Sequence, residues 1–409
     1  MTARRRWWHQ PNRARQGQYA PNLWRVWLAA PICLLAAIVL AGSIYRWLLT
    51  VAVPHPGLNG GPAVTDPLDL IRTTITIAGA VGAVLVGVYG YRKQRLTEGD
   101  AHRADAEQLA QRYTIAAEQL GHEKAAVRLA GVFAIARLAD DWAEQRKECV
   151  DVLCAYLRMP YEPDTASDKH REGEREVRLT IIEIIRDHLR DPNSSTTWCG
   201  YFLQFTGATF DGGDFSRAKF IRNVSFHGAK FTGEWVSFDG AEFISGQVSF
   251  HEAEFSGGDV RFRNAKFSGG EVLFEDVKFG GGVVSFERAE FSGGEVFFNR
   301  AEFRGGVVSF EGAEFAGSII SFYCAKLTSG VVLFYGAEFT DGKVFFVRAD
   351  FAGSKVSFYG AKFVGGEISF DEVRPSDGDV SFEDAEFTGS RIIWGPFEPP
   401  LAWTAQQEK

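Results

Sequence analysis

Cysteine and histidine are the residue types best suited to metal binding or nucleophilic chemistry, and their spacing in this chain supports neither. The five cysteines form no C-x-x-C pair and have no histidine at metal-ligand spacing; they are Cys33, Cys149, Cys154, Cys199 and Cys324. An odd, scattered set of this kind favours a reducing compartment over a disulfide framework. Cys149 and Cys154 are therefore interpreted as small core residues of a helix rather than as a redox pair.

The histidines and the glycine-rich segments likewise lack the spacing that catalysis requires. None of the eight histidines belongs to an H-x-x-x-H or H-E-x-x-H motif; they are His9, His55, His102, His122, His170, His188, His227 and His251. We expect His251 and Glu252 to form a solvated surface pair at a turn. There is no G-x-x-x-x-G-K-[ST] phosphate loop and no G-x-S-x-G nucleophile motif. The sequence therefore predicts no enzyme and no catalytic, cofactor-binding or metal-binding residue.

Phenylalanine provides the dominant pattern of the chain, as a ladder from Phe205 to Phe387. The first steps are five residues long, and from Phe231 onward steps of seven and five residues alternate. Of the 32 positions in this ladder 30 are Phe, and the exceptions are Leu327 and Pro375. The residue two before each is usually Ala or Val, so the unit reads A-x-F-x-G-G-x-V-x-F-x-x. A fixed short period of this kind predicts a solenoid.

The unit explains how such a solenoid would be built. In A-x-F and V-x-F the outer two side chains share one face of an extended segment and the middle one lies on the other. The middle positions carry residues suited to water, among them Glu242, Ser249, Glu254, Arg261, Lys266 and Glu290. Gly pairs such as Gly257-Gly258 give the backbone freedom for a corner. An open antiparallel sheet is the alternative, but it does not explain the equally spaced second corner, which lacks Gly pairs.

The section from Phe205 to Phe220, with A-T-F-D-G, G-D-F-S-R and A-K-F at five-residue spacing, resembles a pentapeptide-repeat protein. The resemblance implies a right-handed four-sided β-helix in which the central Phe and the residue two before it point inward. Later units depart from the family pattern because two residues are added at every second corner. With four faces per coil, this favours 24 residues per coil over the 20 of the family. Eight coils would stack to about 38 Å at about 4.8 Å per layer.

The N-terminal region has the composition of a membrane anchor. Residues 1–25 are basic and aromatic without acidic residues, and an uncharged run follows from Val26 to Tyr45. That run is long enough to cross a bilayer core of about 30 Å. A signal peptide is the alternative, but the run is long for one and a second span is predicted from about Thr73 to Tyr91. In the second span Gly79, Ala83 and Gly87 form a small-xxx-small stripe that suits close contact with the first span or with another subunit.

The charges beside the two spans predict the topology. Six arginines precede the first span and Arg92, Lys93 and Arg95 follow the second, whereas the loop between them has Arg46 and Arg72 only at its edges. The positive-inside rule then places both termini in the cytoplasm, as in a multi-pass protein of the cell membrane. Aromatic residues stand where interface residues are expected; they are Trp24, Trp27, Tyr45, Trp47, Tyr89 and Tyr91.

Helical periodicity follows the spans, from residue 98 to residue 190. We expect a first helix that ends at Gly121, and then helices over Ala125–Trp142, Arg146–Leu157 and Glu176–Arg190. The strings V-R-L-A-G-V from Val127 and V-L-C-A-Y-L-R from Val152 resemble the helical segment that precedes the repeats in membrane-anchored bacterial pentapeptide-repeat proteins. Short stacked helices of this kind are HEAT-like and would cap the first coil.

Taken together, the sequence predicts an α+β protein: two N-terminal transmembrane helices, a small cytoplasmic HEAT-like helical segment, and a four-sided pentapeptide-type β-helix with 12-residue double-face repeats. The expected regions are residues 1–25 (basic N-terminus), 26–91 (membrane region), 98–192 (helical domain), 201–391 (β-helix) and 392–409 (C-terminal cap or tail). At the C-terminal end we expect the aromatic residues after 392 to fold over the last open coil, where Pro375 leaves the ladder without a ring.

Two functions are compatible with these features. The first is a membrane-tethered scaffold, without cofactors, whose β-helix binds a cytoplasmic protein; the two spans contact the lipid bilayer and also allow a homo-oligomer. The second is a mimic of DNA that binds a type II topoisomerase, because residues 201–395 carry 28 acidic and 18 basic residues. Lysines alternate with glutamates at equivalent positions, and a membrane tether disfavours a mimic of chromosomal DNA. Direct binding of nucleic acid is not expected, because the sequence has no basic stripe.

Overall fold

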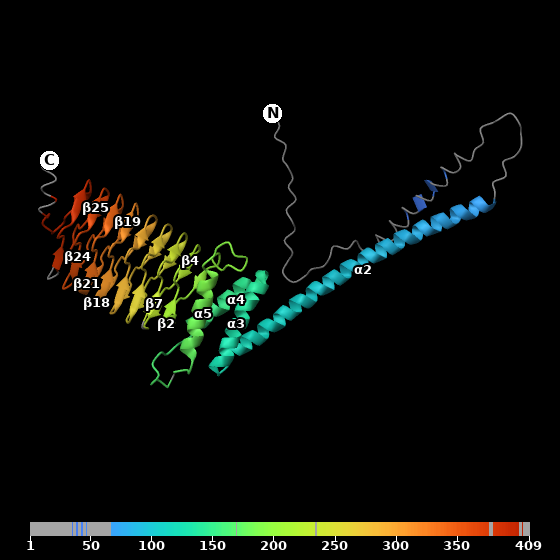
Figure 1. Cartoon of the computed structure of the whole chain (residues 1–409), viewed down its shortest axis with the longest axis horizontal. Coiled ribbons are helices and arrows are strands. Elements are labelled where there is room, and N and C mark those ends of the chain that lie inside the picture. Colours follow the sequence, from blue (N-terminus) through green and yellow to red (C-terminus); the bar gives the residue numbers. More distant parts are fainter. Residues whose placement is uncertain are drawn as a thin grey trace, which may run out of the picture. The chain divides into compact units, whose positions relative to one another are not determined.

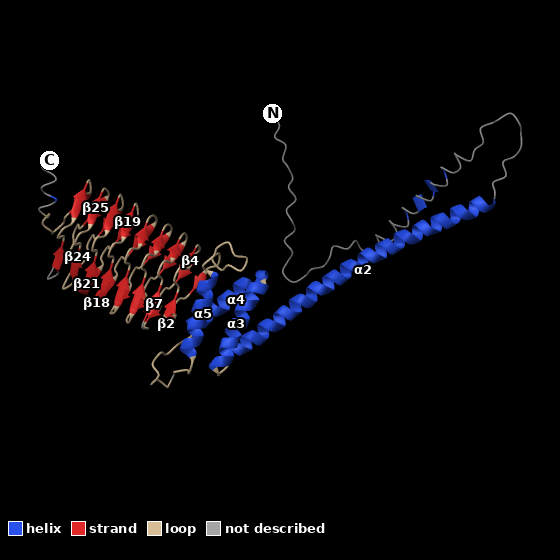
Figure 2. Cartoon of the chain, in the orientation of Figure 1, coloured by secondary structure: helices blue, strands red, loops and turns tan. Residues whose placement is uncertain are grey.

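The computed structural model contains a helical segment followed by a right-handed β-solenoid of about eight turns (Figure 1 and Figure 2). It describes residues 35, 38, 39, 42, 43, 46, 67–168, 170–233, 235–375, 379–400 and 403. Two compact units divide the chain, Met1–Ala110 and Gln111–Lys409. The basic N-terminus, and the predicted first span apart from a few positions, lie outside the described residues.

Helix α2 runs without interruption from Pro67 to Leu120 and is 54 residues long. Proline is favoured at a helix start, because its fixed φ suits the first turn and its missing N–H has no intrahelical partner there. The span expected to end at Tyr91 and the helix expected from residue 98 both lie on this one helix, with no break in the backbone between them. The basic residues after Tyr91 change the polarity of the helix but do not interrupt its backbone. Within the described part of the chain, no helix has both the length and the apolar character needed to cross a membrane.

Short helices follow α2 with nearly the expected bounds; they are α3 (Ala125–Asp141), the 3-10 helix η1 (Ala143–Gln145), α4 (Arg146–Arg158) and α5 (Glu174–His188). Helix α3 packs against both α4 and α5. Gly131 of α3 lies against the end of α2, because a Cβ there would be 2.5 Å from the backbone nitrogen of Leu120. Apolar side chains of these short helices are buried, including Val132, Leu153 and Ile181, whereas the face predicted for the first helix is largely exposed at Ala106, Ala110 and Ala117.

The solenoid is built from three parallel sheets, which we call sheets A, B and C. In spatial order sheet A contains β1 (Leu203–Gln204), β5 (Val224–Ser225), β9 (Gln247–Ser249), β13 (Glu271–Leu273), β17 (Glu295–Phe297), β20 (Ile319–Ser321), β23 (Lys343–Phe345), β26 (Glu367–Ser369) and β29 (Arg391–Ile393). Sheet C contains β4 (Lys219–Phe220), β8 (Glu242–Phe243), β12 (Lys266–Phe267), β16 (Glu290–Phe291), β19 (Glu314–Ala316), β22 (Glu338–Thr340), β25 (Lys362–Val364) and β28 (Glu386–Thr388).

Sheet B covers the two remaining faces of the coil. Face B1 contains β2 (Thr209–Phe210), β6 (Lys230–Phe231), β10 (Glu254–Phe255) and β14 (Lys278–Phe279). Face B2 contains β3 (Gly213–Asp214), β7 (Trp235–Ser237), β11 (Asp259–Arg261), β15 (Val283–Ser285), β24 (Lys355–Ser357) and β27 (Asp379–Ser381). The longer strands β18 (Glu302–Ser309) and β21 (Lys326–Leu333) pass through the corner and join the two faces.

The register of the strands gives the length of a coil. Phe255 pairs with Phe279, and Val248 with Val272, so equivalent residues in neighbouring turns are 24 positions apart. The first turn is shorter, because Leu203 pairs with Val224. All pairs of named strands are parallel, which excludes the open antiparallel sheet and confirms the predicted 24-residue coil.

The Phe ladder forms the interior of the solenoid, as predicted. Phe226, Phe250 and Phe274 lie in successive turns with ring centroids 4.8 Å apart and nearly parallel planes. Rings from different faces of a coil meet edge to face, as Phe250 and Phe262 do at 5.8 Å. Aromatic rings attract one another in both geometries, in addition to the apolar area that they bury.

The two kinds of corner meet different requirements. At the glycine corners, Gly282 has a φ of +71°, and a Cβ there would lie 1.9 Å from the carbonyl oxygen of Gly258 in the turn before. Glycine is therefore needed both for the backbone conformation and for the close stacking of turns. The other corners hold left-handed residues that have side chains, such as Arg288 (φ 53°) and Arg300 (φ 56°). In these corners an Ala N–H donates to a Phe carbonyl, as Ala253 does to Phe250 at 2.9 Å.

The solenoid extends beyond residue 391, where we expected it to end. Strand β29 pairs with β26, and Trp394 then takes the inward position that Phe370 holds one turn earlier. Trp394 is buried and its ring also contacts Phe382 and Phe387. The ladder therefore closes on a tryptophan, which a search for Phe alone does not include.

Candidate functional site

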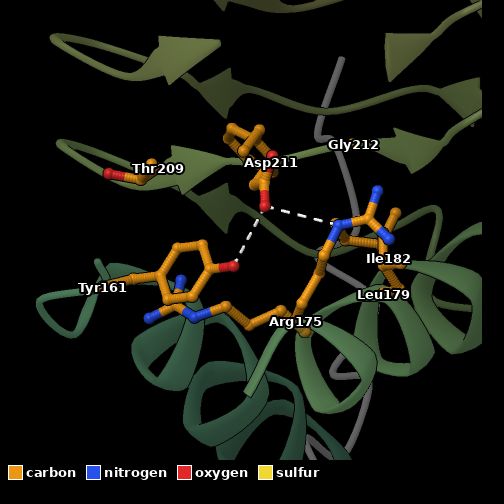
Figure 3. A pocket seen from close by; sticks show the side chains of 9 residues that line it. Tyr161, Arg175, Leu179, Ile182, Thr209, Asp211 and Gly212 are labelled. Carbon is orange, nitrogen blue, oxygen red and sulfur yellow. Dashed lines mark hydrogen bonds and ion pairs between the residues drawn. The ribbon is translucent and has the colours of Figure 1, made fainter. Parts of the chain in front are cut away.

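A polar contact fastens the helices to the first turn of the solenoid (Figure 3). The carboxylate of Asp211, just after β2, accepts a hydrogen bond from the hydroxyl of Tyr161 at 3.1 Å. The same oxygen lies 3.3 Å from Nε of Arg175 on α5. Behind Tyr161, the guanidinium of Arg178 stacks over the ring at 4.5 Å from its centroid. Burial, together with Asp211, raises the pKa of Tyr161 to about 12.

A buried charge cluster lies deeper in the helical domain and continues this contact. Glu174 faces Arg128 at 3.3 Å and Arg178 at 3.2 Å, and it accepts a hydrogen bond from Tyr156 at 2.9 Å. The side chain of Arg128 is fully buried, and those of Arg178 and Glu174 are almost so. Burial lowers the pKa of Arg178, while Glu174 opposes that shift. Sequence periodicity did not reveal this cluster, because an arginine inside an apolar pattern is ordinarily placed at the surface.

The pocket enclosed by these residues is too small for a ligand. Its volume is about 10 Å³, which is the space of one water molecule. Ile182 lies close to the backbone of the first turn: a Cβ built at Gly213 would be only 2.9 Å from Cδ1 of Ile182. Arg186 of α5 also pairs with Asp214 of β3. These contacts hold α5 against the first turn, in agreement with the expected capping helices.

The cysteines and histidines do not assemble a reactive centre in the described residues. Cys149 and Cys154 are buried in α4, and burial raises their pKa to about 11 and about 12, so both thiols stay protonated. His251 lies at a corner with its Nε2 3.8 Å from a carboxylate oxygen of Glu252, as expected, and its ring is tilted by 34° to that of His227 in the previous turn, with centroids 5.1 Å apart. Its Nδ1 is 3.7 Å from Asp276. Within the described ranges, no group of three or more His, Cys, Asp or Glu side chains could hold a metal ion.

The outer surfaces of face B1 and sheet C are covered by paired charges. Lys278 donates to Glu254 at 2.9 Å, and Lys326 to Glu302 at 3.1 Å, each across neighbouring turns. On sheet C, Lys266 lies 2.8 Å from Glu290 and Lys362 lies 2.8 Å from Glu338. Both the alternation of lysine and glutamate and their outward direction were predicted. The 24-residue coil brings the opposite charges into register.

The outer surfaces of sheet A and face B2 are different, because apolar side chains lie on them. On face B2, Val283, Val307 and Val331 follow one another in register. On sheet A, Leu273 pairs with Phe297, and Phe345 lies two turns beyond Phe297. These side chains point away from the Phe ladder; Val283 is exposed and the others are half-buried. The repeat pattern did not reveal them: Leu273 and Phe297 are middle positions, which were assigned to water as a class, and the position of Val283, just before a triplet, was not assigned.

The three-sheet stack of 24-residue turns defines a β-solenoid protein. Within it, residues 205–246 match the family model described as Pentapeptide repeats (9 copies). The matched part covers the first turn and nearly all of the second, and it includes the five-residue steps from Phe205 to Phe220. Residues 205–246 are therefore a pentapeptide-repeat segment. Comparison of the chain with curated proteins and with solved structures gave no match.

Proposed function

We propose that this protein is a membrane-tethered scaffold whose solenoid binds a partner protein in the cytoplasm, without catalysis. The observation that carries this proposal is the pair of apolar outer surfaces on sheet A and face B2. The Phe ladder forms the core without them, so the fold itself does not require apolar residues at these positions. A stacked solenoid gives such residues fixed spacing, which suits a binding surface.

The tether is inferred from charge and composition. Residues 73–91 of α2 carry no charged residue, and Arg92, Lys93 and Arg95 follow at once. With the uncharged run 26–45 and the arginines before it, this favours a multi-pass protein of the cell membrane with both termini in the cytoplasm. Among the residues that the structure describes, nothing lies within 4 Å of a Cβ built at Gly79 or Gly87, which suits close contact of this helix face with a second helix. A homo-oligomer through α2 is therefore part of the proposal.

The charge distribution favours the scaffold over the DNA mimic. A mimic requires an uninterrupted acidic surface, since duplex DNA carries a phosphate charge at every step. On face B1 and sheet C, however, Glu254, Glu290, Glu302 and Glu338 each lie in an ion pair with a lysine. The excess of acidic residues therefore does not form such a surface on these faces.

Two experiments test the proposal. A reporter fused after Lys409 should be active only in the cytoplasm, and one inserted near Asn59 only outside. Cross-linking and pulldown from cells that express the full-length protein should then recover a specific protein partner, and topoisomerase subunits should be absent. Labelling of the repeat region from outside would overturn the tether. Recovery of topoisomerase subunits alone would favour the mimic.

A further inference from the structure

The outer surface of sheet A has two columns of residues that follow the strand register. One column runs through Gln247, Glu271, Glu295, Ile319 and Lys343, and the other through Ser249, Leu273, Phe297, Ser321 and Phe345. Glu275 stands at the adjoining corner. We define the sheet-A patch as Glu271, Leu273, Glu275, Glu295, Phe297 and Phe345.

Glu271 and Glu295 of the patch face each other without a cation, whereas Glu275 at the corner is attracted by Arg300 in the next turn. Glu271 and Glu295 are register partners in neighbouring strands, where like charges destabilise a sheet. Among the described residues neither they nor Glu275 lies in an ion pair. Their side-chain contacts are with neutral amides: Gln247 donates to Glu271 at 2.9 Å, and Asn299 to Glu275 at 3.1 Å. On face B1 and sheet C, by contrast, lysines one turn away neutralise glutamates at 2.8–3.1 Å.

The apolar residues of the patch lie beside these carboxylates. Leu273 is the register partner of Phe297, and both project from the outside of the sheet, between inward residues that are buried. Serine occupies the same column at Ser249, Ser321 and Ser369, so the sheet forms equally well with a small polar residue there. Neither the phenyl groups nor the uncompensated charge is thus needed for the fold.

We propose that the sheet-A patch binds a basic, apolar segment of the partner protein, with lysine or arginine side chains on Glu271, Glu275 and Glu295 and apolar side chains against Phe297. This inference rests on the proposed scaffold function and assigns its surface. Charge complementarity selects the occupant. A second copy of the same patch would bring carboxylate against carboxylate, and an anionic lipid surface would be repelled.

A peptide experiment with the full-length protein in nanodiscs of zwitterionic lipid tests the inference. The probe is a short fluorescent amphipathic peptide of lysine with leucine and phenylalanine. One matched peptide has glutamate in place of lysine, and another has serine in place of the apolar residues. We expect only the basic apolar peptide to bind. Phe297→Ser removes an apolar anchor and Glu295→Gln removes a charge, so each should weaken the affinity for this peptide about tenfold. Val364→Ser and Glu314→Gln, both at exposed positions of sheet C, are matched controls and should leave its affinity unchanged.

Each other outcome overturns the inference. No binding, equal loss in the control variants, or equal binding of the serine peptide would exclude the patch as a site for basic apolar segments. If sedimentation shows that the protein self-associates, and Phe297→Ser abolishes this self-association, the occupant of the patch is a second copy of the chain. Pulldown separates this result from the scaffold function. If Phe297→Ser and Glu295→Gln still recover the cellular partner, the patch is wrong and the scaffold stands. If no form recovers a partner, the scaffold itself fails.

Discussion

The ring of Phe397 stacks on the ring of Phe351, with centroids 6.0 Å apart and planes 19° from parallel. Phe351 would otherwise be covered by the next residue in its column, which is Pro375, and Pro375 is exposed. Phe397 also meets Phe370 edge to face at 5.5 Å. A residue from beyond the ladder therefore supplies the ring that the last turn lacks. This is the fold-over of the C-terminal aromatics expected from the sequence.

Removal of this ring should expose the end of the solenoid. Deletion of residues 395–409 leaves β29 and Trp394 but removes the ring of Phe397 from Phe351 and Phe370, and the uncovered rings at the open end of the solenoid can then pack against another molecule. We expect the shortened protein to self-associate in a concentration-dependent way in sedimentation velocity. Deletion of residues 404–409, which keeps Phe397 and Trp403, is the control. A shortened protein that sediments like the full-length one would show that the tail has no capping role.

The repeated parts of the fold could be predicted from the sequence, whereas the contacts at positions where the repeat is broken could not. The ladder, the inward Ala and Val, and the coil length all follow from periodicity, because every turn solves the same packing problem. Phe397 could not be assigned to the position of Pro375, because it lies outside the ladder and no local pattern links the two. Arg128 and Glu174 were missed for a related reason. Their contact joins two helices across a polar loop, and amphipathic patterns carry no information about such pairs.

The inward and outward directions of a strand can be compared at Phe291 and Glu290. Phe291 is fully buried between Phe267 and Phe315, with centroids 4.7 Å and 4.8 Å away. Phe291→Ala should lower the free energy of unfolding by about 3–5 kcal/mol. Glu290→Ala removes only an exposed ion pair with Lys266, so we expect a loss of about 0.5 kcal/mol or less. Urea unfolding followed by circular dichroism measures both, and similar losses would mean that the directions are wrongly assigned.

Replacement of glycine by alanine should cost more stability at a glycine corner than at the other kind of corner. Gly282→Ala combines a left-handed backbone with overlap of the new Cβ and the carbonyl oxygen of Gly258, and should cost about 2–5 kcal/mol. Gly336 has a similar φ of +58°, and no described residue lies within 4 Å of a Cβ built there, so Gly336→Ala should cost only about 1 kcal/mol. Arg288 already occupies the left-handed position two turns earlier. Thermal unfolding compares the variants, and equal shifts would rule out turn-to-turn contact as the cause.

The ion pair at one corner should appear in a carboxyl titration. Arg300 hydrogen-bonds to Asp276 and thereby lowers the pKa of that carboxyl below its ordinary 3.8. Because the folded pKa is the lower one, the pair stabilises the fold above pH 3.8, and the benefit is lost as the pH falls through the folded pKa. Arg300→Gln should raise the Asp276 pKa toward 3.8 in an NMR titration, whereas Arg288→Gln should leave it unchanged. An unaltered Asp276 titration in Arg300→Gln would refute the assignment.

The last prediction concerns the cluster that supports the contact between the helices and the solenoid. Glu174→Gln keeps the shape of the side chain but leaves Arg128 and Arg178 buried without a counter-charge. Removal of one partner from a buried ion pair typically costs about 3–5 kcal/mol, because the remaining charge cannot reach water. Glu176→Gln, at an exposed position on the same helix, should change stability by less than about 0.5 kcal/mol.

The place where hydrogen exchange increases distinguishes a loss of the Glu174 ion pairs from a general loss of stability. Arg178 stacks on Tyr161, and Tyr161 donates to Asp211, so loosening of the cluster should reach the first turn before the later ones. Hydrogen exchange in Glu174→Gln should therefore increase in α5 and around Asp211, while the amides near Phe291 stay protected. The double variant Glu174→Gln with Arg178→Met removes one of the two stranded charges and should recover part of the loss. If it is less stable than Glu174→Gln alone, the hydrogen bonds that Arg178 donates to the carbonyls of Leu157 and Met159 outweigh its unpaired charge, and the cluster is not held together mainly by the ion pairs assigned here.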